Sequence, residues 1–202
     1  CKTFTEIVIA TGVEPDALNE FARKKSLRVI TVKKDFLSQT IEQNFRQTPG
    51  GILLQEKDVK TVLKSDMDVV SMRKPTENQK EDMLFSWKVC KHLKSNAIVL
   101  AKNTSTIGVG AGQMSRVDST KIAIRKAEEM VKISQNEQFF IHGAVAASDA
   151  FFPFPDSIFE LAKAGVKAVI QPGGSINDTA VIEAADQSDI SMIFTYVRHF
   201  KH

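Results

Sequence analysis

The sequence has 202 residues, of which 43% are hydrophobic and 25% are charged, with a formal net charge of +3. This length and balance predict a globular protein with one large domain or two small ones. Basic residues are spread out without interleaved aromatics, and no apolar run approaches the roughly 20 residues that span a bilayer. We therefore expect no binding to nucleic acid or to a membrane. Two cysteines, Cys1 and Cys90, make no disulfide framework, which favours a cytoplasmic setting.

In the first half of the chain, the pattern predicts a β-α-β unit followed by irregular chain and short strands. Pro15 stands where a helix can begin, and Phe21 belongs to the apolar face of that helix. Residues 33–50 have no clear period and lead into Pro49-Gly50-Gly51, so we expect a loop there. The strands are expected at residues 4–10, 27–32, 52–55 and 67–72.

A new helix begins just after Pro75. Thr76 is its expected N-cap, and Gln79, three residues later, completes a capping box. We place a domain boundary before this helix, which gives one domain at residues 1–74 and a second at residues 75–202.

The second half of the chain is organised around residues 95–116. Two short apolar strands are joined by a polar turn, and a glycine-rich elbow, Gly108-x-Gly110-x-Gly112, then opens a long amphipathic helix. The alternation of strands and helices predicts an α/β fold with helices packed on a mixed sheet. The strands are expected at 97–101, 106–109, 139–145, 166–171 and 191–195, and two more helices at 157–164 (capped by Asp156 and ended by Gly165) and from Asn177.

The elbow is the first candidate binding site. Glycines allow a ligand to approach the backbone closely, and the helix that follows offers N–H donors. Asn96 and Arg116 lie at the two ends of the stretch. These features predict a site for a polar or anionic small molecule, but a tight strand-to-helix turn without a ligand explains the glycines equally well.

Three further stretches allow both a binding and a structural interpretation. The loop 149–156 places apolar rings beside the Asp156 carboxylate, which suits a clamp on a heteroaromatic ring or a hydrophobic cluster with a helix cap. The turn Gly173-Gly174-Ser175 is either an anion nest or an ordinary turn. Arg198 either pairs with a phosphate in a bidentate fork or is solvated.

The sequence carries no recognisable metal or nucleophile motif. Its histidines form no His-x-Glu or His-Glu-x-x-His pattern, and no Cys-x-x-Cys, Gly-x-Ser-x-Gly or P-loop occurs. His142 is expected in the core of an apolar strand, and His92 at a solvated or capping position near a helix end. For His199 and His202, a binding role and a plain surface position remain open.

Five segments nevertheless occur in an order that resembles a known family. They are residues 94–97, 107–116, 148–154, 172–175 and 198–202. Together they resemble the C-terminal part of the aminoimidazole carboxamide ribonucleotide (AICAR) transformylase domain of the bifunctional purine biosynthesis proteins, in their bacterial form. The likeness is collinear from about Phe4 to His202. It implies that this chain, which begins with Cys1 rather than methionine, is a fragment of a longer protein.

The resemblance implies a cytidine-deaminase-like layered α/β fold that lacks the zinc site. Residues 1–74 would then be the end of the first transformylase subdomain, and residues 75–202 the second. The family forms homodimers with active sites at the subunit interface. A monovalent cation near the site is compatible with the resemblance.

The implied activity is formyl transfer from the cosubstrate 10-formyltetrahydrofolate to the 5-amino group of AICAR, in de novo purine (IMP) biosynthesis. In the family, a Lys-His pair performs the proton transfer. That pair belongs to a segment upstream of this chain, and so does the IMP cyclohydrolase domain, so we expect the fragment to be inactive alone. The alternatives are a non-catalytic nucleotide- or folate-binding or assembly module and, suggested by fold only, a zinc deaminase.

By motif alignment, the resemblance makes Asn96 the catalytic residue of this chain, because the family's asparagine holds the carboxamide and orients the reactants. Arg198 aligns with the arginine that binds the nucleotide. The other implied substrate-binding positions are Phe151 and Asp156 in the nucleotide and folate pockets, Pro153 and Phe154 on the folate side, and the weaker matches Arg116, Gly173, Gly174 and Ser175. Pro155 departs from the family, which carries arginine before the aspartate.

Overall fold

The computed structural model describes residues 4–37, 43–134, 140–199 and 201. The chain divides into two compact units, Cys1–Asp58 and Val59–His202, and each is described by itself. The expected boundary at 74/75 falls later than this division, inside the second unit. The assignment of two family subdomains is not decided by this division and stays a prediction.

The first unit contains the predicted β-α-β arrangement. Strands β1 (Ile7–Ala10) and β2 (Arg28–Thr31) pair in parallel, and helix α1 (Pro15–Ala22) connects them. Pro15 opens that helix, as expected, because its fixed φ suits the first turn.

The loop or irregular segment expected at residues 33–50 is wrong at 43–48, which form a strand, while residues 38–42 lie outside the described residues. A short 3-10 helix, η1 (Lys34–Leu37), is followed by strand β3 (Gln43–Thr48), which pairs antiparallel with β4 (Gly51–Glu56). Almost every residue of this hairpin is exposed, so no buried face imposes an alternation of apolar and polar residues. Periodicity therefore gave no signal for β3.

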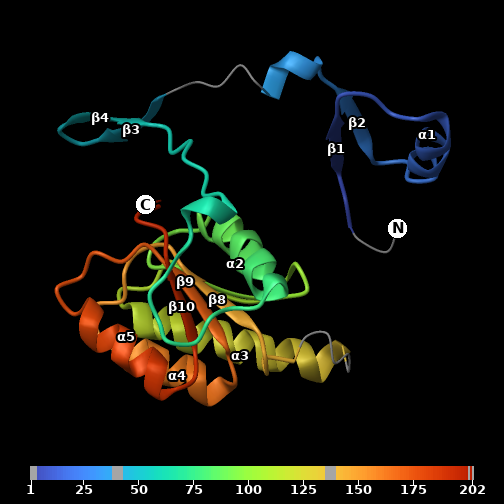
Figure 1. The fold of residues 1–202 in the computed structure, drawn as a ribbon. Helices are drawn as coiled ribbons and strands as arrows, with labels where there is room; N and C mark the ends of the chain where they lie inside the picture. The colour runs from blue at the N-terminus through green and yellow to red at the C-terminus, as the bar shows by residue number, and fades with distance from the viewer. Residues whose placement is uncertain (1–3, 38–42, 135–139, 200, 202) are drawn as a thin grey trace. The chain divides into compact units, whose positions relative to one another are not determined.

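The second unit is built on a six-stranded mixed sheet (Figure 1). The strand order is β5-β10-β9-β8-β6-β7. Strands β8, β9 and β10 run parallel, whereas β5, β6 and β7 pair antiparallel with their neighbours. The bounds are β5 Asp68–Val69, β6 Ile98–Lys102, β7 Ser105–Gly110, β8 Val145–Ser148, β9 Ala168–Gln171 and β10 Ser191–Phe194. The prediction of an α/β fold with a mixed sheet is confirmed.

Helices cover both faces of this sheet (Figure 1). Helix α2 (Glu77–Cys90) packs on one face, where Trp87 and Met83 meet Val99 and its neighbours. On the other face, Ile98 and Leu100 belong to a larger core with three helices. These are α3 (Arg116–Ser134), α4 (Asp156–Ala164) and α5 (Asp178–Gln187); the short 3-10 helix η2 (Lys64–Asp66) precedes the sheet. Burial on both faces explains why the central strands are continuously apolar.

Several predicted boundaries are confirmed by hydrogen bonds or dihedral angles. Thr76 and Gln79 form the predicted capping box, with Gln79 N donating to Thr76 Oγ1 at 3.2 Å and Thr76 N donating to Gln79 Oε1 at 3.0 Å. Gly165 ends α4 in the left-handed conformation, with φ of 94°.

Among the described residues, none of the helices has the length and apolar character needed to cross a bilayer.

The strand expected at residues 139–145 is wrong over 140–144, and residue 139 lies outside the described residues. Strand β8 begins only at Val145, and His142 lies exposed in a turn before it rather than in the core. Alanine is a weak strand former, so the true strand, Val-Ala-Ala-Ser, gave little sequence signal compared with the bulkier residues that precede it.

Candidate active site

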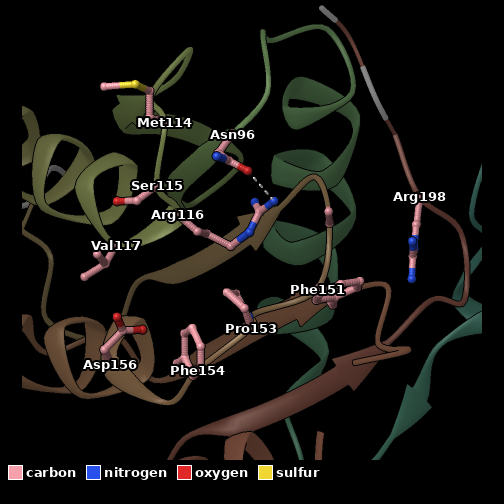
Figure 2. Close-up of a pocket in the computed structure, with 11 residues that line it drawn as sticks. Asn96, Met114, Ser115, Arg116, Val117, Phe151, Pro153, Phe154, Asp156 and Arg198 are labelled. Atoms are coloured by element: carbon pink, nitrogen blue, oxygen red, sulfur yellow. Dashed lines mark hydrogen bonds between the residues drawn. The ribbon is translucent and has the colours of Figure 1, made fainter. Parts of the chain in front are cut away.

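A cavity of about 420 Å³ lies at one edge of the sheet in the second unit (Figure 2). Its walls come from the start of β6, the start of α3, the loop after β8 and the C-terminal tail. The lining residues are Asn96, Met114, Ser115, Arg116, Val117, Ala150, Phe151, Pro153, Phe154, Asp156 and Arg198. Seven of the ten residues singled out from the sequence therefore surround one cavity, although they are scattered over 103 positions of the chain.

The edge is where the parallel strands end. Ser148 of β8 stands opposite Ile98 of β6, and Ile98 stands opposite Gly110 of β7. The end of β8, the beginning of β6 and the end of β7 are thus neighbours. Ligands of open α/β sheets bind beyond the carboxyl ends of the parallel strands, which is the position of this cavity.

Asn96 is held at the cavity by hydrogen bonds with three residues in and just before α3. Its Oδ1 accepts from Arg116 Nη2 at 2.9 Å, and its Nδ2 donates to the carbonyl oxygen of Gln113 at 2.9 Å. Its own carbonyl oxygen accepts from Ser119 Oγ at 2.8 Å. Within the described residues, one Nδ2–H is used in this way, which leaves the second for a ligand.

Arg116 is a buried cation with a buried partner. The residue is 6% exposed, and its Nη1 lies 2.5 Å from Oδ1 of Asp149, which is 1% exposed. Nη1 also donates to Ser148 Oγ at 2.8 Å. A buried arginine needs a carboxylate to offset the cost of its desolvation. Most of the donor capacity of Arg116 is therefore directed at the protein rather than at the cavity.

The glycines of the elbow serve the packing of the helix. A Cβ on Gly110 would lie 1.9 Å from the carbonyl oxygen of Ser119, and one on Gly108 would lie 2.2 Å from that of Ala123. These two glycines let α3 lie directly against β7. At both positions, the space that an anion cradle would need is filled by the helix backbone, as the interpretation of a tight turn requires.

The loop after β8 supplies the apolar wall. Phe151, Pro153 and Phe154 line the cavity, whereas Phe152 turns the other way and is fully buried. The amide of Phe152 donates to Oε1 of the buried Gln171 at 3.0 Å, which fixes the loop to the end of β9. The loop is therefore both a hydrophobic cluster and a cavity wall.

Asp156 lies at the rim of the cavity, as Figure 2 shows. The prediction that its side chain caps the helix is wrong: α4 begins with Asp156 itself, its N-cap is Pro155, and no side-chain cap bond is formed. Asp156 Oδ1 instead accepts from the next amide, Ser157 N, at 2.7 Å. A carboxylate in the first turn is still favoured by the helix dipole, and it remains exposed to a ligand.

Arg198 stands over an aromatic ring at the other end of the cavity. Its guanidinium carbon lies 4.6 Å from the centroid of the Phe151 ring. The turn Gly173-Gly174-Ser175 does not line the cavity but borders this arginine, since a Cβ on Gly174 would lie 3.3 Å from Arg198 Nη2. The amide of Gly174 donates to Asp178 Oδ2 at 2.7 Å, so the protein's own carboxylate occupies this donor of the expected nest.

Besides His142, two histidines have defined positions near the tail. His199 is buried, its ring centroid lies 5.0 Å from that of Trp87, and its amide donates to the carbonyl oxygen of Asp149 at 3.0 Å. His92 is exposed after the end of α2, and its carbonyl oxygen accepts from Lys201 Nζ at 3.1 Å. His202 lies outside the described residues. The tail is thus anchored directly after Arg198, by His199 to Asp149 and by Lys201 to His92.

Asp149 is the functional candidate that the sequence reasoning missed. It stands inside the resembling segment 148–154, and an acidic residue directly after a buried strand was the available signal.

Cys90 lies nearby beneath the sheet, and burial, with a further contribution from Asp149, raises the pKa of its thiol well above the usual 9.0. Cys90 is therefore a thiol at neutral pH and not a nucleophile. Among the described residues, no group of three histidine, cysteine or acidic side chains is arranged to hold a metal ion.

The comparison with known families identifies the chain. The profile of the family described as AICARFT/IMPCHase bienzyme matches residues 1–126. The chain belongs to this family. The resemblance found in the sequence is thereby confirmed, and two of the five segments that carried it lie within the matched residues.

Bifunctional relatives match the chain from end to end. The bifunctional purine biosynthesis protein PurH of Chlorobium chlorochromatii (strain CaD3) is 52% identical over 201 residues, which cover 100% of this chain and 37% of the relative. PurH of Dinoroseobacter shibae is 50% identical over 199 residues, covering 98% of this chain and 38% of the relative. This AICARFT/IMPCHase family member thus spans less than two fifths of the length of these bacterial relatives.

Two solved structures are distantly similar to this member of the family. The dCMP deaminase of cyanophage S-TIM5 has a TM-score of 0.36 and 16% identity, with 59% of this chain and 98% of that chain covered. RibD of Acinetobacter baumannii has a TM-score of 0.36 and 18% identity, with 58% and 34% covered. At this level of similarity, the deaminase-like topology remains an expectation from the family resemblance.

Proposed function

We propose that this chain is part of an AICAR formyltransferase, which transfers a formyl group from 10-formyltetrahydrofolate to the 5-amino group of AICAR in purine biosynthesis. The names of the relatives and of the family support this pathway. The observation that carries the proposal is the convergence of Asn96, Arg198, Asp156 and the phenylalanine loop around one cavity. Their roles are proposed from the chemistry that each group offers there.

The central difficulty of the reaction is the nucleophile. The 5-amino lone pair of AICAR is delocalised into the imidazole ring, so the amine must be oriented closely against the formyl carbon. Asn96 offers an N–H donor at the cavity, and Arg116 polarises that amide through its oxygen. In the proposal, the amide of Asn96 holds the carboxamide of AICAR and sets the neighbouring amine in line.

The rest of the cavity suits a phosphorylated heteroaromatic compound and a folate. Arg198 is an exposed cation able to form a bidentate pair with the nucleotide phosphate. Phe151, Pro153 and Phe154 offer apolar surface to flat rings, and the Asp156 carboxylate accepts from ring N–H or amino groups.

Formyl transfer itself needs a proton shuttle. The amine attacks the formyl carbon, the bond from that carbon to the folate nitrogen breaks, the amine loses a proton, and the folate nitrogen gains one. The proposal assigns this transfer to the family's Lys-His pair, outside these 202 residues. We therefore expect the isolated chain to bind AICAR, and we expect catalytic turnover only when the chain is joined to the upstream region of a relative.

The test uses the chain in two forms. In the first, the 202 residues are purified and titrated with AICAR by calorimetry. In the second, they replace the aligned part of the Chlorobium chlorochromatii PurH, and tetrahydrofolate release is measured. Binding by the chain together with turnover by the chimera supports the proposal. A folded chimera that binds AICAR without turnover favours the non-catalytic module instead.

Asn96→Ala tests the residue that the proposal depends on most. The loss of this orienting donor is expected to be similar to the loss of an oxyanion-hole donor, on the order of 10²–10³ in kcat, or about 3–4 kcal/mol. We expect a loss of this size in the chimera. Asn78→Ala, on the exposed side of α2, is the matched control and should leave kcat unchanged. A change of less than twofold for Asn96→Ala would remove Asn96 from the catalytic role.

A further inference from the structure

The carboxylate of Asp149 is the point where the parts of the site meet. Its Oδ1 accepts from Arg116 Nη1 at 2.5 Å and from the amide of Ala97 at 3.0 Å, and its Oδ2 accepts from the hydroxyl of Ser95. Ser95 and Ala97 are the two chain neighbours of Asn96. One buried side chain therefore holds Asn96 from both sides and also holds the arginine that binds its amide.

The backbone of Asp149 extends the same connection to the tail. Its amide donates to the carbonyl oxygen of Ala97 at 3.3 Å, and its carbonyl oxygen accepts from the amide of His199 at 3.0 Å. His199 directly follows Arg198. The residue is 1% exposed and does not line the cavity, so it acts on a ligand only through the groups it holds.

We propose that Asp149 is a positioning residue for the formyl-transfer site: its carboxylate fixes Arg116 and the backbone on both sides of Asn96, so that the Asn96 amide presents a polarised N–H to the substrate. This inference rests on the proposed function. The physical reason is twofold. An unpaired buried guanidinium would leave its place to regain solvation, and Asn96 would then lose the bond that orients and polarises its amide.

The consequence is a specific kinetic pattern. Asp149→Asn keeps the shape of the side chain and removes the charge that holds Arg116. A displacement of about 1 Å at a catalytic group costs on the order of 10²-fold in rate, so kcat of the chimera should fall by about that factor. The KM for AICAR should change less, because Arg198, the proposed phosphate ligand, is held through the backbone of Asp149 and not through its carboxylate.

A double-mutant cycle with Asn96→Ala separates positioning from general damage. If Asp149 acts through Asn96, Asp149→Asn should reduce kcat by less than about threefold once Asn96 is already alanine, because coupled residues are not additive. The same hundredfold loss in both backgrounds would overturn the proposal. An unchanged kcat in the Asp149→Asn single variant would overturn it as well.

Asp82→Asn is the matched control. Asp82 is also a buried carboxylate, 7% exposed, and it accepts from the amides of Asn103 at 3.0 Å and Thr104 at 2.6 Å, at the opposite end of β6. This variant should lower stability without changing the kcat of the folded enzyme. If Asp149→Asn does not fold, Ser148→Ala takes its place in the cycle; it removes the second acceptor of Arg116 Nη1 together with the donor to the carbonyl oxygen of Ala150. A loss of severalfold that disappears in the Asn96→Ala background supports the proposal, and an additive loss or none overturns it.

A second readout does not depend on catalysis. In the isolated chain, the Asn96 side-chain amide and the Arg116 guanidinium give separate nitrogen–proton NMR signals. Asp149→Asn should move both signals, and Asp82→Asn should move neither. Unmoved signals in folded Asp149→Asn would refute the positioning role. If the chimera without substitutions is inactive, the proposed function is refuted. The NMR signals of the isolated chain then decide whether Asp149 positions Asn96.

Discussion

Gly110→Ala is the substitution with the most direct structural consequence for the site. A Cβ at this position would lie 1.9 Å from the carbonyl oxygen of Ser119 and 2.7 Å from its carbonyl carbon. To restore a contact of 3.0 Å, the helix backbone has to retreat by about 1.1 Å. No side-chain rotation relieves this contact, since both partners are backbone.

The magnitude follows from the size of that shift. Overpacking in a well-packed core typically costs about 1–3 kcal/mol, and we expect the free energy of unfolding to fall by this amount. The same movement displaces Ser119, whose hydroxyl holds the Asn96 carbonyl, and Arg116 in the first turn of α3. Because about 1 Å of misplacement can cost on the order of 10²-fold in rate, the chimera should also lose most of its kcat.

Urea denaturation followed by tryptophan fluorescence measures the stability term. Trp87, the single tryptophan of the chain, is buried in the second unit under the same sheet. Asn78→Ala, at an exposed position of α2 in the same unit as Trp87, is the control. It should stay within about 0.5 kcal/mol of the native chain. An equally small effect for Gly110→Ala would refute the close approach of α3 to β7.

Two further predictions concern charged side chains. Arg198→Ala removes the proposed phosphate ligand that stands over Phe151. In initial-rate measurements on the chimera, it should raise the KM for AICAR by about 10-fold or more, with a smaller effect on kcat. Arg125→Ala, at an exposed position of α3, should change neither constant, and an unaltered KM in the first variant would exclude Arg198 from phosphate binding. The pKa of Asp189 is lowered because Lys167 donates a hydrogen bond to its carboxylate. The contribution of Asp189 to stability is therefore present above its usual pKa of 3.8, and it disappears as the pH falls through the lowered pKa. Asp189→Asn should therefore lower the urea midpoint at pH 7 and match the native chain at acidic pH, whereas a gap that is independent of pH would contradict this linkage.

Much of the fold of the second unit could be predicted because its local signals agree with the tertiary structure. The capping box at Thr76, the glycine that ends α4 and the apolar strands on either side of the polar turn at 102–105 are all where the sequence indicates. Prediction failed where the sequence of a strand carried no pattern of apolar residues typical of a strand. Strand β3 is exposed on both faces, and half of the residues of β8 are alanine, a weak strand former.

The candidate site was predicted in part, for a different reason. The family resemblance supplied Asn96, Arg198 and the phenylalanine loop, but it could not tell which charges face the ligand and which face the protein. Arg116 was expected as a ligand contact, and the structure directs most of its hydrogen bonds to Asp149, Ser148 and Asn96. Such pairings join positions that are about 20–33 residues apart, and they have no local sequence signature.

The strand order explains why these positions meet. Asn96 precedes the first residue of β6, and the N-terminal end of a strand in a parallel sheet lies away from the ligand-binding edge. Strand β6, however, runs antiparallel to β8, so its beginning lies at the carboxyl end of the parallel strands, with Ile98 opposite Ser148. This single reversal puts Asn96 beside Asp149, because the next pair beyond the ladder is Ala97 with Asp149. A shift of the β6–β8 register by one residue would turn Asn96 to the other face of the sheet and separate it from Arg116. The site therefore depends most directly on the contact between Asp149 and Ala97, which fixes this register.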